Sequence, residues 1–339
     1  MNLRTVSANP LIAMFKLAPL FLLSLLFTGA TLAAESHARP QDGPKRINKA
    51  IELLESGQPV YYGYGSGGYA EGKAAARTWA DILMYDMEGA SLDFTQLREF
   101  MRGLVDGGPT PSGHRTPAVI VTLPLYGLDE EVVTANHWMI SQALACGIHG
   151  LHICHARNPG AVRAFIRAAR YEIHRQGVGE GLADGLRAFG GHKFAAEVWG
   201  VSAKKYYQLA DVWPLNPGGE LMIGVKIEDA EGLRDTESIA RVPGLSFAEW
   251  GPRDTAYAAG DLDAAFDYGR KPGFRGSAEQ IAAGERVIAA CKATGLHILD
   301  NAQADDLLEQ LAAGIDIIAG GYEDVAEAGR KHTGRVMPW

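Results

Sequence analysis

Cysteine is scarce in this sequence of 339 residues, which contains only Cys146, Cys154 and Cys291. An odd and sparse set of this kind is not the disulfide framework on which small secreted domains depend. The fold must therefore rest on a buried apolar core, and a chain of this length can bury a large one.

The sequence also has no run of basic residues. It contains 32 Lys and Arg against 40 Asp and Glu, which gives a formal net charge of -8 and a pI of about 5.7. Proteins that bind nucleic acid carry a basic patch or stripe. We therefore exclude nucleic acid as a partner and expect a small-molecule substrate.

Long apolar runs are missing except near the N-terminus, where residues 17–27 are almost entirely apolar. Only Arg4 and Lys16 carry charge before this run ends, and small residues follow it up to Ala34. This order is typical of a secretory signal, and the run is shorter than the roughly 20 residues that a spanning helix needs. We predict that residues 1–34 are a cleaved signal and that the protein is periplasmic or secreted; an uncleaved N-terminal membrane anchor is the alternative.

The polar residues 35–48 are interpreted as a leader, and residues 49–339 as a single domain. In this domain, short apolar and β-prone runs alternate with helical stretches. Continuous apolar runs indicate strands that are buried on both faces of a parallel sheet. The runs lie at residues 59–64, 82–86, 118–123, 150–154, 222–228, 245–250, 296–299 and 315–319.

The helical stretches lie at residues 129–146, 159–170, 231–239, 277–294 and 304–313. Eight strands alternating with helices predict a (β/α)8 TIM barrel. An open doubly wound sheet is the alternative, but the glycine-rich residues 64–68 lack the phosphate-loop spacing of that fold and open no strong helix. The one long connection, residues 172–220, follows the fourth strand, and we expect it at the C-terminal face of the barrel, where active sites lie.

Polar side chains at the C-terminal strand ends are the candidates for chemistry in a barrel. Carboxylates that converge from neighbouring strands repel one another unless a cation lies among them, and oxygen ligands suit Mg²⁺ or Mn²⁺. We interpret His114, His152 and Cys154 as structural. The remaining candidates are Asp86, Glu88, Tyr126, His155, Arg157, Glu228, Asp229, Arg253, Asp254, Asp300 and Asn301.

Several segments resemble motifs of the HpcH/HpaI aldolase and citrate lyase family. The segment VKIE at residues 225–228 resembles the QIE motif, and WGPRDT at residues 250–255 resembles GPADLS. The segment ADILMYDMEG at residues 80–89 is similar to DWxxxDxEH, and GVG at residues 177–179 matches a GVG in the long loop of the family. Residues 145–171 resemble its strand-four unit, and the likeness covers about residues 48–330.

The resemblance implies a class II, metal-dependent carbon–carbon lyase of the aldolase type that acts on a 2-oxo acid and assembles as a trimer or hexamer. In the family, the acids at Glu228 and Asp254 hold a divalent cation, which polarises the ketone and stabilises the enolate. Here the cation would be Mg²⁺ or Mn²⁺. The resemblance places Gly251, Pro252 and Thr255 at the substrate carboxylate.

The sequence departs from the family at two positions. Gly89 stands where DWxxxDxEH has its histidine, and the substrate-contacting arginine of strand three falls at about Ile120 or Val121. We expect His155 to act as the base, and Arg157 or Arg253 to supply the missing charge.

Three other candidates have smaller roles in this interpretation. Tyr126 is a further hydrogen-bond donor, and Asp86 and Glu88 would support the metal ligands.

Two other functions remain open from the sequence. The first is an exported metal-dependent hydrolase, or another enzyme that cleaves a carbon skeleton, run by His155 and a metal-bound water. The second is a relative that binds a ligand without turnover. Decarboxylation of oxaloacetate with added Mg²⁺ or Mn²⁺ would separate them from an aldolase.

Overall fold

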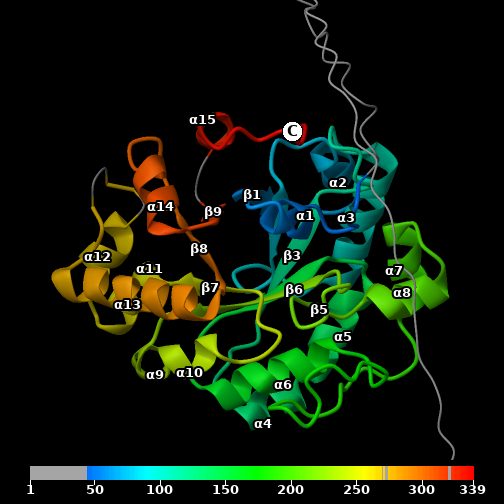
Figure 1. Cartoon of the computed structure of the whole chain (residues 1–339), viewed down its shortest axis with the longest axis horizontal. Coiled ribbons are helices and arrows are strands. Elements are labelled where there is room, and N and C mark those ends of the chain that lie inside the picture. The colour runs from blue at the N-terminus through cyan, green and yellow to red at the C-terminus, as the bar shows by residue number, and fades with distance from the viewer. Residues whose placement is uncertain (1–43, 269, 272–273, 320–321) are drawn as a thin grey trace, which may run out of the picture. The chain divides into compact units, whose positions relative to one another are not determined.

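The computed structural model describes residues 44–339, except residues 269, 272–273 and 320–321 (Figure 1). The predicted signal, residues 1–34, lies outside this range. In the part of the chain that the structure describes, no helix combines the length and apolar composition that crossing a membrane requires.

The described strands form one parallel sheet that closes on itself (Figure 1). β1 pairs with both β2 and β9, and β4 pairs with both β3 and β6, so that eight strands make a barrel and the short β5 is added to the start of β6. The strands are β1 (Val60–Gly65), β2 (Ile82–Asp86), β3 (Ala118–Leu123), β4 (Gly150–Ile153), β5 (Val212–Trp213), β6 (Leu221–Ile227), β7 (Phe247–Trp250), β8 (His297–Asn301) and β9 (Ile317–Ala319).

Helices follow the barrel strands along the chain, as the predicted (β/α)8 barrel requires. They are α1 (Lys49–Glu55), α2 (Tyr69–Ala75), α3 (Phe94–Gly107), α4 (Glu130–Ala135), α5 (His137–Ala145), α6 (Pro159–Ala169), α7 (His192–Trp199), α8 (Ala203–Leu209), α9 (Ala230–Arg234), α10 (Thr236–Ala240), α11 (Pro252–Ala258), α12 (Leu262–Asp267), α13 (Ala278–Thr294), α14 (Leu307–Ala313) and α15 (Glu323–His332). The predicted fold class is confirmed.

The core has two apolar layers, one inside the barrel and one between the strands and the helices. Inward-facing side chains such as Ile82, Ile120 and Met222 fill the barrel. The ring of Phe247 occupies the space beside Gly224, where a Cβ would lie 2.0 Å from it. The barrel is therefore a packed core, and only its rim is open to a ligand.

Each predicted strand overlaps an observed one, with ends that differ by no more than two residues. Two predicted helices are each broken into a pair. Residues 129–146 form α4 and α5, which separate at Asn136, and residues 231–239 fall on α9 and α10, which separate at Asp235.

The glycine-rich segment after β1 does open a helix, contrary to the prediction. Helix α2 begins after Gly68, whose N–H donates to the carboxylate of Glu71 at 2.9 Å. The sequence gives little sign of this helix, because five of its seven residues are exposed and its packing is on a neighbouring helix. A Cβ at Gly72 would lie 2.1 Å from the backbone oxygen of Phe100 in α3, so close contact with α3 holds α2 in place.

The long connection, residues 172–220, lies at the N-terminal ends of the strands and not at the C-terminal face. Because α6 runs back along β4, the chain leaves α6 at the opposite end of the barrel. Trp199 in this connection donates its indole N–H to the oxygen of Gly147, just before β4, at 2.9 Å. The connection contains α7, α8 and β5.

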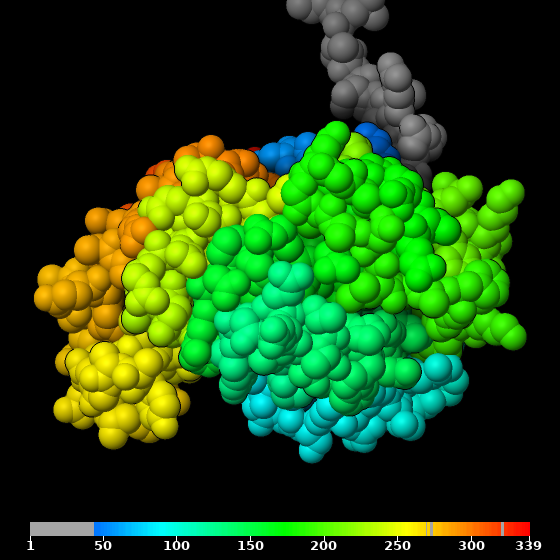
Figure 2. Space-filling model, turned by 90° about the horizontal axis from the view of Figure 1, so that it is seen from below, coloured from blue at the N-terminus to red at the C-terminus, as the bar shows by residue number. Residues whose placement is uncertain are grey.

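The connection is also separate from the segment that carries α11 and α12. On the face shown in Figure 2, the green segment that includes α6 lies between the yellow segment with α12 at the left and the bright green segment with α7 and α8 at the right. In this view the connection lies away from the segment that carries α12.

Candidate active site

A cavity of about 160 Å³ opens at the C-terminal ends of the barrel strands. Tyr62 of β1, Lys226 of β6, Glu249 of β7 and Asn301 of β8 line it, together with residues 250–254. Because these strands are parallel, their C-terminal ends meet at one rim, where their polar side chains converge.

Glu228 and Asp254 come together at this cavity, as the sequence predicts, and a lysine lies between them. The Nζ of Lys226 is 3.1 Å from Glu228 Oε2 and 2.7 Å from Asp254 Oδ2. The Glu228 side chain is 1% exposed and lies behind the cavity lining, whereas that of Asp254 is 41% exposed and belongs to the lining.

Lys226 and the carboxylates around it stabilise one another's charged forms. Burial lowers the pKa of Lys226, but the carboxylates of Glu249 and Glu228 together raise it above its ordinary value, so the side chain is an ammonium. Burial raises the pKa of Glu228, and Lys226 offsets part of this rise. Burial also raises the pKa of Asp254, but the ammonium outweighs it and the pKa is lowered.

A divalent cation does not fit between Glu228 and Asp254 in this arrangement. Mg²⁺ binds carboxylate oxygens at about 2.1 Å, so a bridging cation would share the position of the ammonium. At an effective dielectric constant of about 20, a divalent cation about 3 Å from Lys226 would be repelled by about 11 kcal/mol. Within the described ranges, no three His, Cys, Asp or Glu side chains form a group that could hold a metal. The ammonium of Lys226 therefore lies where a cation that bridges these two carboxylates would lie.

His155 holds Glu228 through its backbone. Its N–H donates to Glu228 Oε1 at 2.9 Å, and its φ of 52° lies in the left-handed region. The imidazole Nδ1 lies 3.6 Å from Glu228 Oε1 and 3.5 Å from Asp229 Oδ2, and the ring packs edge-on against Tyr126. The imidazole is outside the cavity lining, so its contacts are with other side chains of the rim.

The two predicted arginines lie in different places. Arg157 donates its Nε–H to Asp229 Oδ2 at 2.7 Å and stands apart from the cavity. Arg253 lines the cavity and donates to the backbone oxygen of Tyr268 at 3.2 Å. Only Arg253 is therefore placed to meet a substrate in the cavity.

Two of the residues predicted to bind the substrate carboxylate, Gly251 and Thr255, use their donors in hydrogen bonds within the protein. The Gly251 N–H donates to the oxygen of Ile227, and the Thr255 hydroxyl donates to the oxygens of Glu228 and Gly251. Pro252 has no N–H to offer. The N–H groups left at the start of α11 are those of Arg253 and Asp254, because a first helical turn has no earlier carbonyl to bond.

Gly251 has a steric role as well. A Cβ at this position would lie 2.6 Å from Glu228 Oε2 and 2.9 Å from the Cε of Lys226. The absence of a side chain at residue 251 therefore makes the space in which Lys226 meets Glu228.

The predicted supporting residues Asp86 and Glu88 lie on the loop after β2. Asp86 accepts hydrogen bonds from the N–H groups of Glu88 and Gly89, at 2.8 and 3.1 Å, and so shapes the loop. Glu88 Oε2 accepts a hydrogen bond from the Cys154 thiol at 2.8 Å. The hydrogen bonds of both carboxylates are thus made within the rim, to partners other than Glu228 and Asp254.

Sequence reasoning missed Lys226 and Glu249. They are paired residues on β6 and β7, and each is a charge inside an otherwise apolar strand. This pattern was visible in the sequence, because a charge in a buried strand must face either a partner or a site. Burial raises the pKa of Glu249 to about 7, and its Oε2 lies 3.3 Å from His152 Nε2.

The family arginine has no counterpart at Ile120 or Val121. Ile120 is buried inside the barrel and Val121 is buried on its outer side. The last inward-facing side chain of β3 is Thr122, which pairs in register with Asp86 and His152. Its hydroxyl lies 3.5 Å from His152 Nδ1, and it is the one polar side chain of β3.

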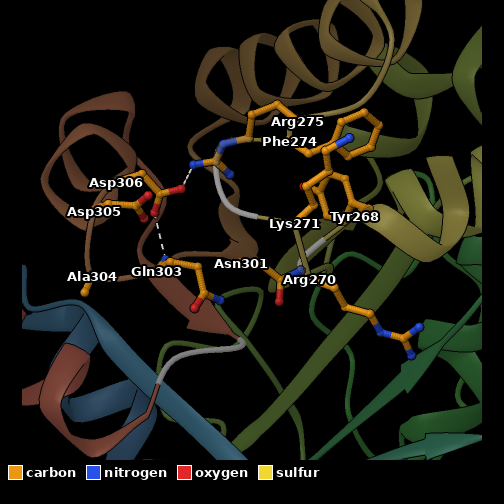
Figure 3. Close-up of a pocket in the computed structure, with 10 residues that line it drawn as sticks. All are labelled: Tyr268, Arg270, Lys271, Phe274, Arg275, Asn301, Gln303, Ala304, Asp305 and Asp306. Atoms are coloured by element: carbon orange, nitrogen blue, oxygen red, sulfur yellow. Dashed lines mark hydrogen bonds and ion pairs between the residues drawn. The ribbon is translucent and has the colours of Figure 1, made fainter. Parts of the chain in front are cut away.

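A second cavity, of about 310 Å³, adjoins the first (Figure 3). Tyr268 and Asn301 line both cavities. In the larger one, Arg275 is paired with Asp306, while the Arg270 side chain extends away from that pair (Figure 3). The two cavities together give a site with room for more than a three-carbon acid.

No protein-family model matches the sequence. An HpcH/HpaI aldolase/citrate lyase family protein from Burkholderia cenocepacia superposes with a TM-score of 0.60 at 24% identity, over 85% of this chain and 98% of that one. An HpcH/HpaI aldolase from Desulfitobacterium hafniense gives 0.58 at 18% identity, over 84% of this chain and 96% of the other. The chain therefore shares the barrel fold of these two solved proteins.

The chain also resembles two proteins with named reactions. A hydroxypyruvate/pyruvate aldolase of Paraburkholderia phytofirmans is 24% identical over 196 residues, which are 58% of this chain. The match spans 64% of that relative, less than two thirds of its length. Macrophomate synthase superposes with a TM-score of 0.58 at 20% identity, over 86% of this chain and 88% of the other.

Proposed function

We propose that this chain is an aldolase-type enzyme that breaks or forms a carbon–carbon bond next to the carbonyl of a 2-oxo acid. The observation that carries the proposal is the fixed positive charge of Lys226 in the rim cavity, held by Glu228 and Asp254. The barrel shared with HpcH/HpaI aldolases and the match to a hydroxypyruvate/pyruvate aldolase support the same reaction class. Pyruvate and hydroxypyruvate are therefore the first substrates to test.

In the cleavage direction, the bond between C3 of the oxo acid and the carbinol carbon breaks. Its electron pair forms the C2–C3 double bond while the carbonyl π electrons move to the C2 oxygen, and the carbinol becomes an aldehyde after its hydroxyl loses a proton. The enolate then takes this proton back at C3, so that one base serves both transfers and, in reverse, removes a proton from the methyl group of pyruvate. A positive charge beside the C2 oxygen lowers the barrier, because negative charge develops there in the transition state.

Glu249 is the base that we propose for the hydroxyl proton. It lines the same cavity and lies beside Lys226 across the β6–β7 pairing. A general base is most effective when its pKa lies near the working pH, and burial raises the pKa of Glu249 to about 7. The imidazole Nε2 of His152 lies 3.3 Å from Glu249 Oε2, on the barrel side of the carboxylate.

The second cavity is proposed to receive the other half of the substrate. It continues from the rim cavity through Tyr268 and Asn301, and Arg270 stands in its lining. A guanidinium suits a carboxylate or another polar group on the aldehyde half. Arg270→Ala should therefore raise KM more for acceptors that carry a carboxylate than for neutral ones.

The activity is tested with the purified protein, pyruvate and a panel of aldehydes. Exchange of the pyruvate methyl protons for deuterium, followed by NMR, reports the enolate without needing the correct aldehyde. We expect exchange by the wild type and its loss in Glu249→Gln. Binding of pyruvate with no exchange, no decarboxylation of oxaloacetate and no aldol product would instead favour a ligand-binding relative, to which the glycine at residue 89 also points.

We further propose that the protein acts outside the cytoplasm and forms a homo-oligomer. The signal-like residues 1–34 support export, which N-terminal sequencing of the mature protein would test. The likeness to HpcH/HpaI aldolases supports a trimer or hexamer, which light scattering would measure.

A further inference from the structure

We propose that the ammonium of Lys226 takes the place of the divalent cation expected from the sequence motifs, so that this chain polarises its carbonyl substrate without a metal. The catalytic half of this inference rests on the proposed function, whereas the metal-binding half does not. Lys226 stands where the QIE motif has its glutamine, so one substitution distinguishes this chain from the motif at that position.

The position of the ammonium is the first support. Lys226 Nζ is within 3.1 Å of Glu228 Oε2 and 2.7 Å of Asp254 Oδ2, the two side chains that the motifs assign to the cation. An ion that bridges both carboxylates must occupy the space where the ammonium lies. The ammonium and a divalent cation therefore cannot both lie there, because they would overlap and their like charges would repel.

The way the surroundings hold this arrangement is the second support. Glu228 Oε1 is fixed by the backbone N–H of His155 at 2.9 Å, which leaves Oε2 turned toward the lysine. The Glu228 backbone oxygen accepts from the Thr255 hydroxyl at 2.8 Å. The glycine at residue 251 leaves room for the lysine stem, because a Cβ there would be 2.9 Å from Lys226 Cε.

The charges of the cavity are the third support. Glu249 and Asp254 line it with Lys226, and Arg253 bonds to the backbone at its edge. Among the described residues that line the cavity, Lys226 is thus the one cation that is held by two carboxylates, those of Glu228 and Asp254. Once a 2-oxo acid is bound, the C2 oxygen can accept a hydrogen bond from this ammonium, which has three N–H donors. No covalent bond to the lysine is needed.

Metal binding is measured first, because it needs no substrate. Free Mn²⁺ is followed by electron paramagnetic resonance during titration with the metal-stripped protein. We expect very weak Mn²⁺ binding by the wild type. For Lys226→Gln we expect an Mn²⁺ affinity at least about 100-fold higher, because the repulsion between the ammonium and the cation is removed. Lys226→Arg is the matched control, since it keeps a positive charge and should remain unable to bind Mn²⁺.

Two outcomes would overturn this half of the inference. Tight Mn²⁺ binding by the wild type would show that the lysine leaves the site, and equal Mn²⁺ affinity of wild type and Lys226→Gln would show that the lysine does not block it. Circular dichroism checks that each variant is folded. If Lys226→Gln is not folded, Lys226→Met removes the same charge and is titrated in its place.

Catalysis is measured second, by deuterium exchange of pyruvate in the presence of EDTA. We expect the wild type to retain full exchange and Lys226→Gln to lose it. Loss of wild-type exchange in EDTA, restored by Mn²⁺, would contradict the inference. Trapping of pyruvate on Lys226 by borohydride would also contradict it, because it would show a covalent imine. A wild type inactive under every condition would refute the proposed function, while the Mn²⁺ titration would still decide the metal question.

Discussion

The backbone N–H of His155 and the carboxylate of Glu228 are joined by a 2.9 Å hydrogen bond, and His155 reaches it only in a left-handed conformation with φ of 52°. Such a backbone conformation costs of order 1–3 kcal/mol for a residue other than glycine and tends to occur where function requires it. At this position the strained residue supplies the donor that turns Glu228 toward Lys226.

The first prediction separates this backbone role from the imidazole. His155→Gly keeps the N–H and relieves the strain, so we expect turnover within about threefold of the wild type and unchanged or higher stability. His155→Val should lower stability by about 1–3 kcal/mol, because a β-branched residue tolerates positive φ poorly. Thermal unfolding and pyruvate exchange measure both. A hundredfold loss in His155→Gly would instead restore the imidazole as the base that the sequence suggested.

The second prediction concerns the pH dependence of turnover. Burial raises the pKa of Glu249 to about 7. A base must be ionised to accept a proton, so activity should rise as pH increases through about 7 and fall below it. Glu249→Gln should lower kcat by about 10²–10⁴-fold, the usual contribution of a general base, and should remove this limb of the pH profile. An unchanged profile in the variant would assign the titration to another group.

The third prediction tests the space that Gly251 provides. A Cβ there would meet Glu228 Oε2 at 2.6 Å and Lys226 Cε at 2.9 Å, so Gly251→Ala must displace one of the two. The backbone at Gly251 has φ of -104°, which lies outside the left-handed region that favours glycine. We expect a folded protein whose kcat falls by at least about tenfold, as expected when a charge at the reacting oxygen is moved. Full activity in the variant would show that Lys226 and Glu228 need not be in contact.

The fourth prediction concerns stability at the opposite end of the barrel. The fully buried Asp81 accepts hydrogen bonds from Arg335 at 2.6 and 2.7 Å, and its carboxylate lies 2.8 Å from the ammonium of Lys49 and 3.3 Å from Arg330. Removing one partner from a buried network of this kind costs about 3–5 kcal/mol. Asp81→Asn should therefore unfold at a markedly lower denaturant concentration.

Its matched control is an exposed pair. Asp184 bonds to Arg175 with both side chains more than half exposed, so Asp184→Asn should cost no more than about 1 kcal/mol. Burial raises the pKa of Asp81, but Lys49 and Arg335 outweigh it and lower the pKa below its ordinary value. The stabilisation is therefore present above the unfolded pKa of about 3.9 and is lost as pH falls below it. Equal acid sensitivity of wild type and Asp81→Asn would contradict this account.

Much of the barrel could be predicted because its signals are local. Apolar runs such as residues 82–86 and 118–123 carry their own hydrophobic pattern, and both match the observed strands residue for residue. The helix breaks at Asn136 and Asp235 were not predicted, because the apolar pattern continues across them. The prediction that the long connection, residues 172–220, lies at the C-terminal face is wrong. The connection follows α6, and α6 returns the chain to the N-terminal end of the barrel.

The sequence by itself determined that Glu228 and Asp254 follow adjacent strands, and parallel strands necessarily bring such side chains to one rim. Only the tertiary structure decided what lies between them. Lys226 reads as one charge in an apolar strand, and whether its flexible side chain turns toward solvent, Glu249 or the two carboxylates depends on packing that no local pattern encodes. The space above Gly251 and the hydrogen bond from His155 settle that choice, since both come from segments that are distant in the chain and meet only when the barrel closes.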